Sequence, residues 1–285
     1  MDVIERIPNT RNPIAIWYSQ TIITADAEGH RMKPTTAKNP VRSIERASEI
    51  LSLLKERNGA RLVELEDEID LSKGTIHSYL ATLEQCGFVA KRGMVYHVGF
   101  GCLDLGGHVR DRDPLYAAGR EGADELAEET GELVALVTNW HGRCLWLYRT
   151  TGDNAMPADT HLGVQLPMHC TASGKALLAE LPDERVAEIV DVHGLSAWTA
   201  NTITDRGELF DRLDEIHDRR IAFDDEERIS GLRGIGAPIR SEGTLLGAIA
   251  MSGPVNRLQG DRFWNELPDQ IKKIQRMIEA NATYL

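Results

Sequence analysis

The sequence predicts an α+β fold divided between two domains. A length of 285 residues exceeds the usual size of one domain. Three helical patterns and a hairpin pattern fall within residues 39–98. From residue 113 onward strand and helix patterns interleave, which favours a mainly antiparallel sheet with helices packed on it.

Residues 1–38 show neither helical nor strand periodicity, and Pro8, Pro13 and Pro34 interrupt them. We therefore expect this segment to be a disordered tail, or an extension that precedes the natural start. Met32 is the candidate for that start, which would leave residues 1–31 untranslated in the cell.

The first domain, residues 39–98, begins with two helical patterns. Ser43 is the expected cap of the first helix, which ends at Asn58-Gly59. Its apolar stripe is expected to consist of Ile44, Ala47, Leu51 and Leu54. A shorter helix is expected over residues 63–69.

A third helix is expected after Ser72, which can cap it, and should end near Gln85. Its inward positions are Ile76, Leu80 and Leu83. Residues 88–98 form the pattern of two short strands around Arg92-Gly93. Three short helices followed by a hairpin are typical of a winged helix-turn-helix.

One helix fits the major groove of B-DNA, so the third helix is the candidate reader of a DNA sequence. Lys73 and the first backbone N–H groups suit phosphates, and polar side chains near its start suit base edges. The hairpin tip carries two basic residues that suit the DNA backbone. The candidate DNA-contacting residues are Ser72, Lys73, Thr75, His77, Ser78, Lys91 and Arg92.

The distribution of charge supports this assignment. The net charge is −12, and residues 99–285 carry all of that excess, whereas residues 39–98 carry a net −1. An acidic domain repels DNA, so a DNA contact belongs to the N-terminal block. The near-neutral block also fits an alternative, a small helical domain that contacts other proteins. Scarce lysine beside abundant Asp and Glu fits a high-salt cytoplasm, as in halophilic archaea, and also many acidic mesophilic proteins.

Residues 99–112 are expected to form a linker helix whose apolar residues Leu103, Leu105 and Val109 pair two protomers. In the second domain, residues 113–285, Asp113-Pro114 begins a helix that Gly131 ends. Strands are expected at 133–138, 144–149, 164–166, 221–223, 235–240 and 245–252, and helices at 173–181, 183–192, 205–219 and 269–281.

A small-molecule site is expected where residues 171–175 pass from a loop into a helix. Free N–H groups and small side chains there suit a carboxylate. Asp224 can accept hydrogen bonds from ligand hydroxyls, and Ser252 can donate or accept. Each residue also has a structural explanation. Thr171 and Ser173 can simply cap the helix, Asp224 can cap a turn or pair with Arg233, and Ser252 can end a strand.

Asp224 would repel a carboxylate placed against it, so the expected ligand is a hydroxylated or carbonyl-bearing organic or sugar acid rather than a dicarboxylate.

Enzyme functions have weak support. Gly174-Lys175 lacks the spacing of a phosphate-binding loop, and Ser173 lacks the G-x-S-x-G turn. Cys170 beside His169 is a candidate thiol nucleophile, but neighbours in a strand point to opposite faces.

Neither a metal nor a cofactor is expected. Cys144, His161, His169 and Cys170 are scattered and show no metal-binding spacing. No apolar run is long enough to cross a bilayer and no cleavable signal pattern is present, so we expect a cytoplasmic protein.

Several motifs between about residue 40 and the C-terminus occur together in one known family. They are Arg42–Ala47, Ser72–His77, Leu83–Val89, Leu166–Leu177, Thr199–Asp205, Ala222–Glu227 with Gly231 and Leu232, and Ala248–Pro254 with Arg257. In these motifs and their order the chain resembles the IclR family of transcriptional regulators. The resemblance implies a winged helix, a dimerising linker helix and a GAF-like antiparallel effector domain. It further implies a homodimer or homotetramer that binds a near-palindromic DNA operator, acts as repressor or activator, and responds to a small metabolite.

Three positions depart from the family pattern. Ser78 stands where the family often has Arg in the reading helix. Gly234 and Ala250 stand where a glyoxylate- and pyruvate-responsive relative has Cys and Ser, which argues against such a ligand. With Gly234 included, the candidate effector-binding residues are Thr171, Ala172, Ser173, Gly174, Asp224, Gly234 and Ser252.

Overall fold

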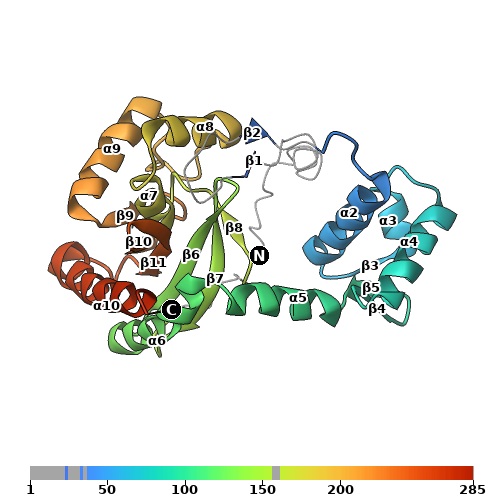
Figure 1. Ribbon diagram of the computed structural model, residues 1–285, viewed down its shortest axis with the longest axis horizontal. Coiled ribbons are helices and arrows are strands. Elements are labelled where there is room, and N and C mark those ends of the chain that lie inside the picture. Colours follow the sequence, from blue (N-terminus) through green and yellow to red (C-terminus); the bar gives the residue numbers. More distant parts are fainter. Residues whose placement is uncertain (1–22, 25–32, 35–36, 156–160, 285) are drawn as a thin grey trace, which may run out of the picture. The chain divides into compact units, whose positions relative to one another are not determined.

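The computed structural model describes residues 23–24, 33–34, 37–155 and 161–284. The chain divides between Val109 and Arg110 into two units (Figure 1). Two short strands, β1 (Ile23–Thr24) and β2 (Lys33–Pro34), pair with each other. The rest of residues 1–36 lies outside the described residues, so the expectation of a disordered tail falls there.

The N-terminal unit is a winged helix-turn-helix, as predicted. Its helices are α2 (Arg42–Glu56), α3 (Leu62–Glu66) and α4 (Lys73–Gln85). An antiparallel sheet of order β3-β5-β4 contains β3 (Ala60–Arg61), β4 (Val89–Arg92) and β5 (Val95–Val98). The hairpin and the third helix match their predicted bounds. Ser72 caps α4 by accepting a hydrogen bond from the Thr75 backbone, and the inward residues of α4 are buried as expected.

The expected start of α2 was wrong. Val41, not Ser43, precedes the helix, and no side chain caps it. Ile44 is 68% exposed, whereas Ile50 and Leu54 are fully covered. The buried part of the apolar stripe therefore begins later along α2 than predicted.

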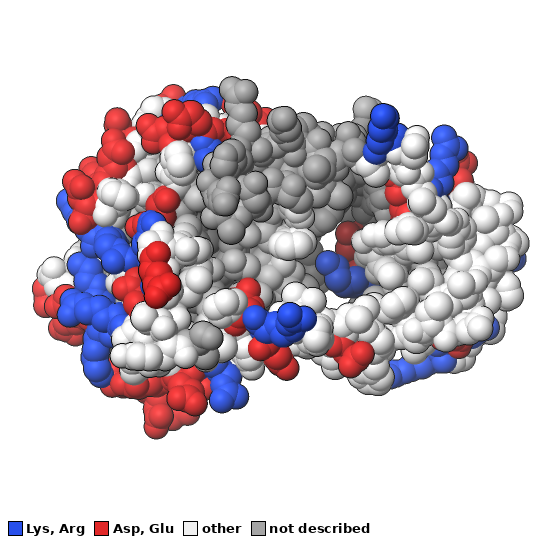
Figure 2. All heavy atoms as spheres, in the orientation of Figure 1, with Lys and Arg blue, Asp and Glu red and all other residues white. Residues whose placement is uncertain are grey.

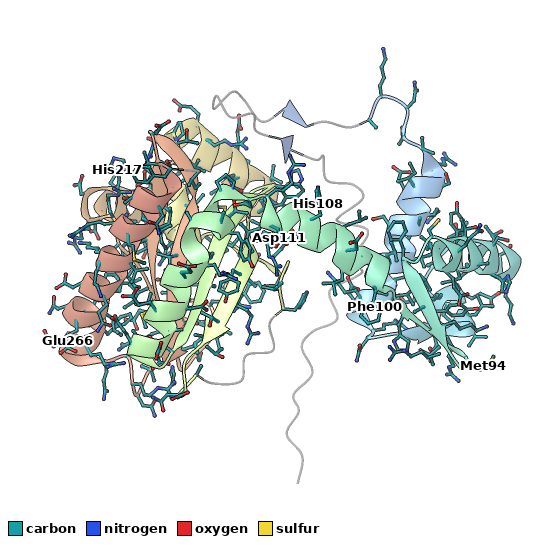
Figure 3. All side chains as sticks on the ribbon, turned by 60° about the horizontal axis from the view of Figure 1, so that its bottom comes forward. Met94, Phe100, His108, Asp111, His217 and Glu266 are labelled. Atoms are coloured by element: carbon teal, nitrogen blue, oxygen red, sulfur yellow. The ribbon has the colours of Figure 1, made fainter. Side chains whose placement is uncertain are left out.

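Helix α5 (Phe100–Asp111) follows β5 and leads to the C-terminal unit. None of its residues is buried. Phe100 begins it, and His108 and Asp111 lie towards its end (Figure 3).

The C-terminal unit contains a six-stranded antiparallel sheet of order β8-β7-β6-β11-β10-β9, which confirms the predicted fold class. The strands are β6 (Leu133–Trp140), β7 (Arg143–Thr151), β8 (Gln165–Leu166), β9 (Ala222–Asp225), β10 (Leu232–Ser241) and β11 (Thr244–Pro254). Ser252 does not end β11, which continues to Pro254.

Helices pack on both faces of this sheet (Figure 1). One face carries α6 (Pro114–Thr130), the π-helical turn η1 (Arg262–Glu266) and α10 (Leu267–Ala282). The other carries α7 (Ala172–Leu178), α8 (Asp183–His193) and α9 (Arg206–Arg219). Residues of β6 alternate between the two cores, since Val134 and Leu136 face α6 and α10 while Ala135 and Val137 face α7.

Charge is distributed unevenly. In Figure 2 acidic side chains are scattered over the visible face of the C-terminal unit, whereas the same view of the N-terminal unit is mostly uncharged. Along the sequence the charges of residues 39–98 nearly balance, with a net −1, and residues 99–285 carry the acidic excess. Within the described residues, no helix is both long and apolar enough to span a bilayer.

Candidate effector cavity and DNA-reading helix

The C-terminal unit contains a cavity of about 360 Å³ between the sheet and α7. Most of its wall is apolar. The lining residues are Leu133, Ala135, Val137, Trp146, Leu166, Thr171, Ala172, Ser173, Asp224, Arg228, Ile229, Leu232, Gly234, Ala250, Met251, Ser252 and Gly253. A mostly apolar cavity with a few polar groups is typical of small-molecule sites.

Six of the seven predicted effector residues lie around this cavity: Thr171, Ala172, Ser173, Asp224, Gly234 and Ser252. Gly174 is not among the lining residues. A Cβ on Gly174 would lie 2.3 Å from the Cα of Met168, so this glycine permits α7 to approach the preceding loop. Glycine is therefore required at position 174 for steric reasons, and the sequence pattern alone did not show this.

The hydroxyl of Thr171 caps α7. It accepts a hydrogen bond from the Gly174 backbone at 3.2 Å and donates one to the Pro167 carbonyl at 2.9 Å. One N–H group that we expected to be free for an anion is therefore already satisfied. Ser173 lies deeper, with its hydroxyl 3.9 Å from the Cys144 sulfur.

Asp224 is buried at the cavity wall. Its carboxylate accepts a hydrogen bond from the Glu227 backbone at 2.8 Å, so it caps a turn. It does not pair with Arg233, which binds Asp225 at 2.6 Å. Burial, with a smaller contribution from the charge of Glu227, raises the pKa of Asp224 to about 7. A carboxyl group that titrates near neutrality can donate as well as accept a hydrogen bond.

Arg228 also lines the cavity, and the sequence analysis missed it. Its Nε is buried without a hydrogen-bond partner among the described residues. The indole Nε1 of Trp146, on the cavity wall, is likewise buried and unpartnered there. Two unsatisfied donors are a costly arrangement unless a ligand accepts from them. Arg228 follows the acidic run of residues 224–227, and no motif in the sequence singles it out.

The cysteines of this region do not suit nucleophilic chemistry. Cys144 and Cys170 have no exposed surface. Burial raises the pKa of Cys144 to about 11 and that of Cys170 to about 12, so both thiols stay protonated. In the described part of the chain, no group of three His, Cys, Asp or Glu residues is placed to hold a metal ion.

In the N-terminal unit, all five predicted contact residues on or before α4 are exposed: Ser72, Lys73, Thr75, His77 and Ser78. The hydroxyls of Ser72 and Thr75 bind each other at 2.8 Å, and that of Ser78 donates to the Gly74 carbonyl at 3.0 Å. Within the part of the chain that the structure describes, the side chains of Lys73 and His77 make no such contact. Gly74 and Ala81, which the sequence analysis did not select, also lie exposed on α4 and have small side chains or none.

The hairpin between β4 and β5 presents Lys91 and Arg92, both exposed. The ammonium group of Lys91 lies 5.0 Å from the ring centre of Tyr96, which holds it on one side of the hairpin. Met94, 75% exposed, lies at the hairpin tip (Figure 3).

Two family descriptions match the chain. Residues 43–93 match the IclR helix-turn-helix domain, and residues 108–280 match the bacterial transcriptional regulator IclR C-terminal domain. Together they cover most of the chain. The chain belongs to the IclR family. It is therefore a transcriptional regulator, in which a DNA-binding domain is joined to an effector domain.

Individual relatives agree with this. A probable HTH-type transcriptional regulator ArcR of Halobacterium salinarum is 34% identical over 87% of this chain and 98% of its own. The crystal structure of the Thermotoga maritima IclR has a TM-score of 0.71 and 26% identity, covering 85% of this chain and 99% of the other. An IclR homologue of Microbacterium hydrocarbonoxydans, solved with 4-hydroxybenzoate, shares the fold at a TM-score of 0.71 and 20% identity, covering 80% and 92% of the two chains.

Proposed function

We propose that this IclR-family regulator changes its affinity for DNA when an organic acid with an apolar body occupies the 360 Å³ cavity. The observation that carries the proposal is Arg228, whose buried Nε lacks a partner among the described residues and lies beside a mainly apolar wall. A guanidinium binds a carboxylate through paired, charge-assisted hydrogen bonds. The apolar wall then accommodates the remainder of the acid.

The polar groups of the cavity favour an acid that carries one further polar substituent, a hydroxyl or a carbonyl. Trp146 offers an unpartnered N–H, and Asp224 can accept from a hydroxyl or, when protonated, donate to a carbonyl. Sugar acids would need more hydrogen-bonding partners than this wall supplies. The 4-hydroxybenzoate bound to the Microbacterium homologue has this chemistry, and we extend it to the present chain as a class of candidate.

DNA recognition is assigned to α4 and the hairpin after it. His77 and Ser78 are proposed to read base edges, while Lys73, Lys91 and Arg92 hold phosphates. Of these, the ring of His77 and the ammonium of Lys73 are free of hydrogen-bonding partners among the described residues. The proposed target is a near-palindromic operator in the cytoplasm.

Pairing of two protomers is assigned to α5. Phe100, Leu103, Leu105 and Val109 are between 54% and 79% exposed, although all are apolar. A second copy of the chain is the proposed partner, because a dimer places two α4 helices on half-sites roughly 34–36 Å apart, one turn of DNA. A tetramer can form from two such dimers.

Calorimetric titration with 4-hydroxybenzoate, benzoate and gluconate tests the ligand class. Benzoates are expected to bind and gluconate is not, and Arg228→Gln is expected to weaken benzoate binding by about tenfold, the effect of losing one charge-assisted hydrogen bond. Arg212→Gln, an exposed change outside the cavity, is the matched control. Binding of gluconate alone, or equal binding by the Arg228 and Arg212 variants, would contradict the proposal.

Fluorescence anisotropy with labelled duplexes from the gene's own upstream region tests the DNA assignment. Tight binding to one duplex, altered by the bound acid, is expected. An absence of binding at low salt would favour the alternative that the winged helix contacts proteins.

A further inference from the structure

A second and smaller cavity, of about 70 Å³, lies in the C-terminal unit. It shares no lining residue with the larger one. Its walls come from the turn between β6 and β7, the loop before α7, and α8 with the segment that follows. Loop residues 167–169 line this cavity, whereas Leu166 and Thr171 on either side of them line the larger one.

The small cavity is lined by one guanidinium and two imidazoles, and burial lowers the pKa of both imidazoles, which favours their neutral form. Arg143, His169 and His193 contribute to the wall, and no Asp or Glu is among its lining residues. Arg143 is partly buried, and among the described residues its guanidinium has neither an ion pair nor a hydrogen bond to a side chain. Burial lowers the pKa of Arg143, as expected for a charge taken from water without a counter-ion.

Both imidazoles are held in place by backbone carbonyls. The Nε2 of His169 donates to the Ser196 carbonyl at 3.0 Å, and the Nε2 of His193 donates to the His141 carbonyl at 2.7 Å. Gly142 makes the second contact possible, since a Cβ there would lie 2.8 Å from the Nε2 of His193. With the proton on Nε2, the Nδ1 of neutral His193 can only accept a hydrogen bond, and it is buried without a partner in the described structure.

We propose that this cavity is a binding site for a small oxyanion, with Arg143 as its principal ligand. Burying part of a guanidinium costs free energy that a counter-charge offsets, and the described residues offer Arg143 no ion pair. On this measure about 10–15 Å³ is enough to hold one water molecule, so a cavity of about 70 Å³ has room for an ion of a few heavy atoms. The proposal does not depend on the ligand of the larger cavity.

Calorimetric titration of the full chain with sodium phosphate and, separately, sodium acetate at constant ionic strength tests the site. Saturable binding of at least one of the two ions is expected. Binding of phosphate alone would identify the ligand as an inorganic oxyanion, and binding of acetate alone would identify it as a carboxylate. Arg143→Gln should weaken it by about tenfold or more, whereas Arg143→Lys should retain part of it. Circular dichroism checks that each variant is folded.

Arg212→Gln provides the matched control, because it removes an exposed cation that lines neither cavity. It should leave phosphate or acetate binding within about twofold, and Arg143→Gln should leave benzoate binding equally unchanged. Absence of saturable binding by both ions would overturn the proposal. So would binding that Arg228→Gln abolishes and Arg143→Gln does not.

Discussion

The fully buried ammonium group of Lys175 in α7 binds the buried carboxylate of Glu227, in the loop after β9. The pair connects the helix that begins at the effector cavity with the loop that carries Arg228. Both charges also act on Asp224, since Glu227 raises and Lys175 lowers the pKa of that carboxyl group. One buried network therefore connects three of the elements around the cavity.

Breaking this pair on one side should be strongly destabilising. Lys175→Met leaves the Glu227 carboxylate buried and uncompensated, which is expected to lower the free energy of unfolding by about 3–5 kcal/mol. Adding Glu227→Leu should restore a large part of that loss, because no buried charge then remains. Urea unfolding of the single and double variants measures both effects.

The matched control is Arg206→Ala, which removes an exposed ion pair with Asp191 of 2.9 Å. It should change the free energy of unfolding by about 1 kcal/mol or less. A double variant at position 175 and 227 that is as unstable as the sum of its single changes would show that the two charges are not coupled.

Asp224 should make the stability of the protein depend on pH. Its folded pKa of about 7 lies above the ordinary value of 3.8, so between these values the folded protein holds a proton that the unfolded chain releases. The stability gained from that proton is complete below about pH 4 and is lost as the pH rises through 7. Asp224→Asn, which stays neutral, should therefore stabilise the protein more at pH 8 than at pH 5.

Urea unfolding at the two pH values measures this change, with Asp191→Asn as the exposed control. An effect of Asp224→Asn that is equal at pH 5 and pH 8 would show that Asp224 is ionised at both.

The ends of a helix could be predicted from the sequence where the residues at those ends determine them. Asp113 accepts a hydrogen bond from the Leu115 backbone at 2.9 Å, Pro114 follows, and Gly131 ends α6 with a φ of +77°. Each of these requirements is visible in the sequence. The start of α2 has no side-chain cap, so Ser43 was a misleading signal there.

The cavity was only partly predictable because its residues come from distant strands. Thr171 and Ser252 could be selected as hydroxyl residues beside small side chains, and Asp224 as a carboxylate that can accept hydrogen bonds from a ligand. Arg228 could not, since only the three-dimensional structure shows that its Nε is buried without a partner. The small cavity around Arg143 depends in the same way on segments 50 residues apart in the chain.

His77 should contribute to the choice of DNA sequence. It is exposed on α4 next to two hydroxyl side chains that have backbone or side-chain partners. His77→Ala is expected to lower operator affinity by about 1–3 kcal/mol while sparing nonspecific duplexes. Fluorescence anisotropy on both duplexes measures this, and equal loss on the two would contradict base reading.

Lys91→Ala provides the contrasting case, because a phosphate contact carries no sequence information. It should weaken binding to both duplexes alike and reduce the slope of log affinity against log salt by about 1 per protomer. A loss confined to the operator would assign Lys91 to base reading instead.

Exposed apolar residues on α5 should hold the proposed dimer together. Leu103 is 68% exposed in the single chain, and Leu103→Glu places a charge on the surface that we assign to the second copy. Sedimentation velocity should show a shift towards monomer, and operator affinity should fall by about a hundredfold because the two half-sites are no longer bound together. Asp104→Asn on the same helix is the control, and an unchanged sedimentation profile for Leu103→Glu would place the dimer contact elsewhere.

Two glycines near the cavity should respond differently to the same substitution. A Cβ on Gly174 would lie 2.3 Å from both the Cα and the carbonyl oxygen of Met168, so Gly174→Ala must displace backbone. We expect it to lower the free energy of unfolding by about 1–3 kcal/mol.

A Cβ on Gly234 meets its nearest atom, the Met251 carbonyl oxygen, at an ordinary 3.4 Å, so Gly234→Ala should fold normally. Because Gly234 lines the cavity, that variant should instead bind larger benzoates less tightly, and urea unfolding with calorimetric titration separates the two effects. Similar stability losses in both variants would show that Gly234 is also a packing requirement rather than a determinant of ligand size.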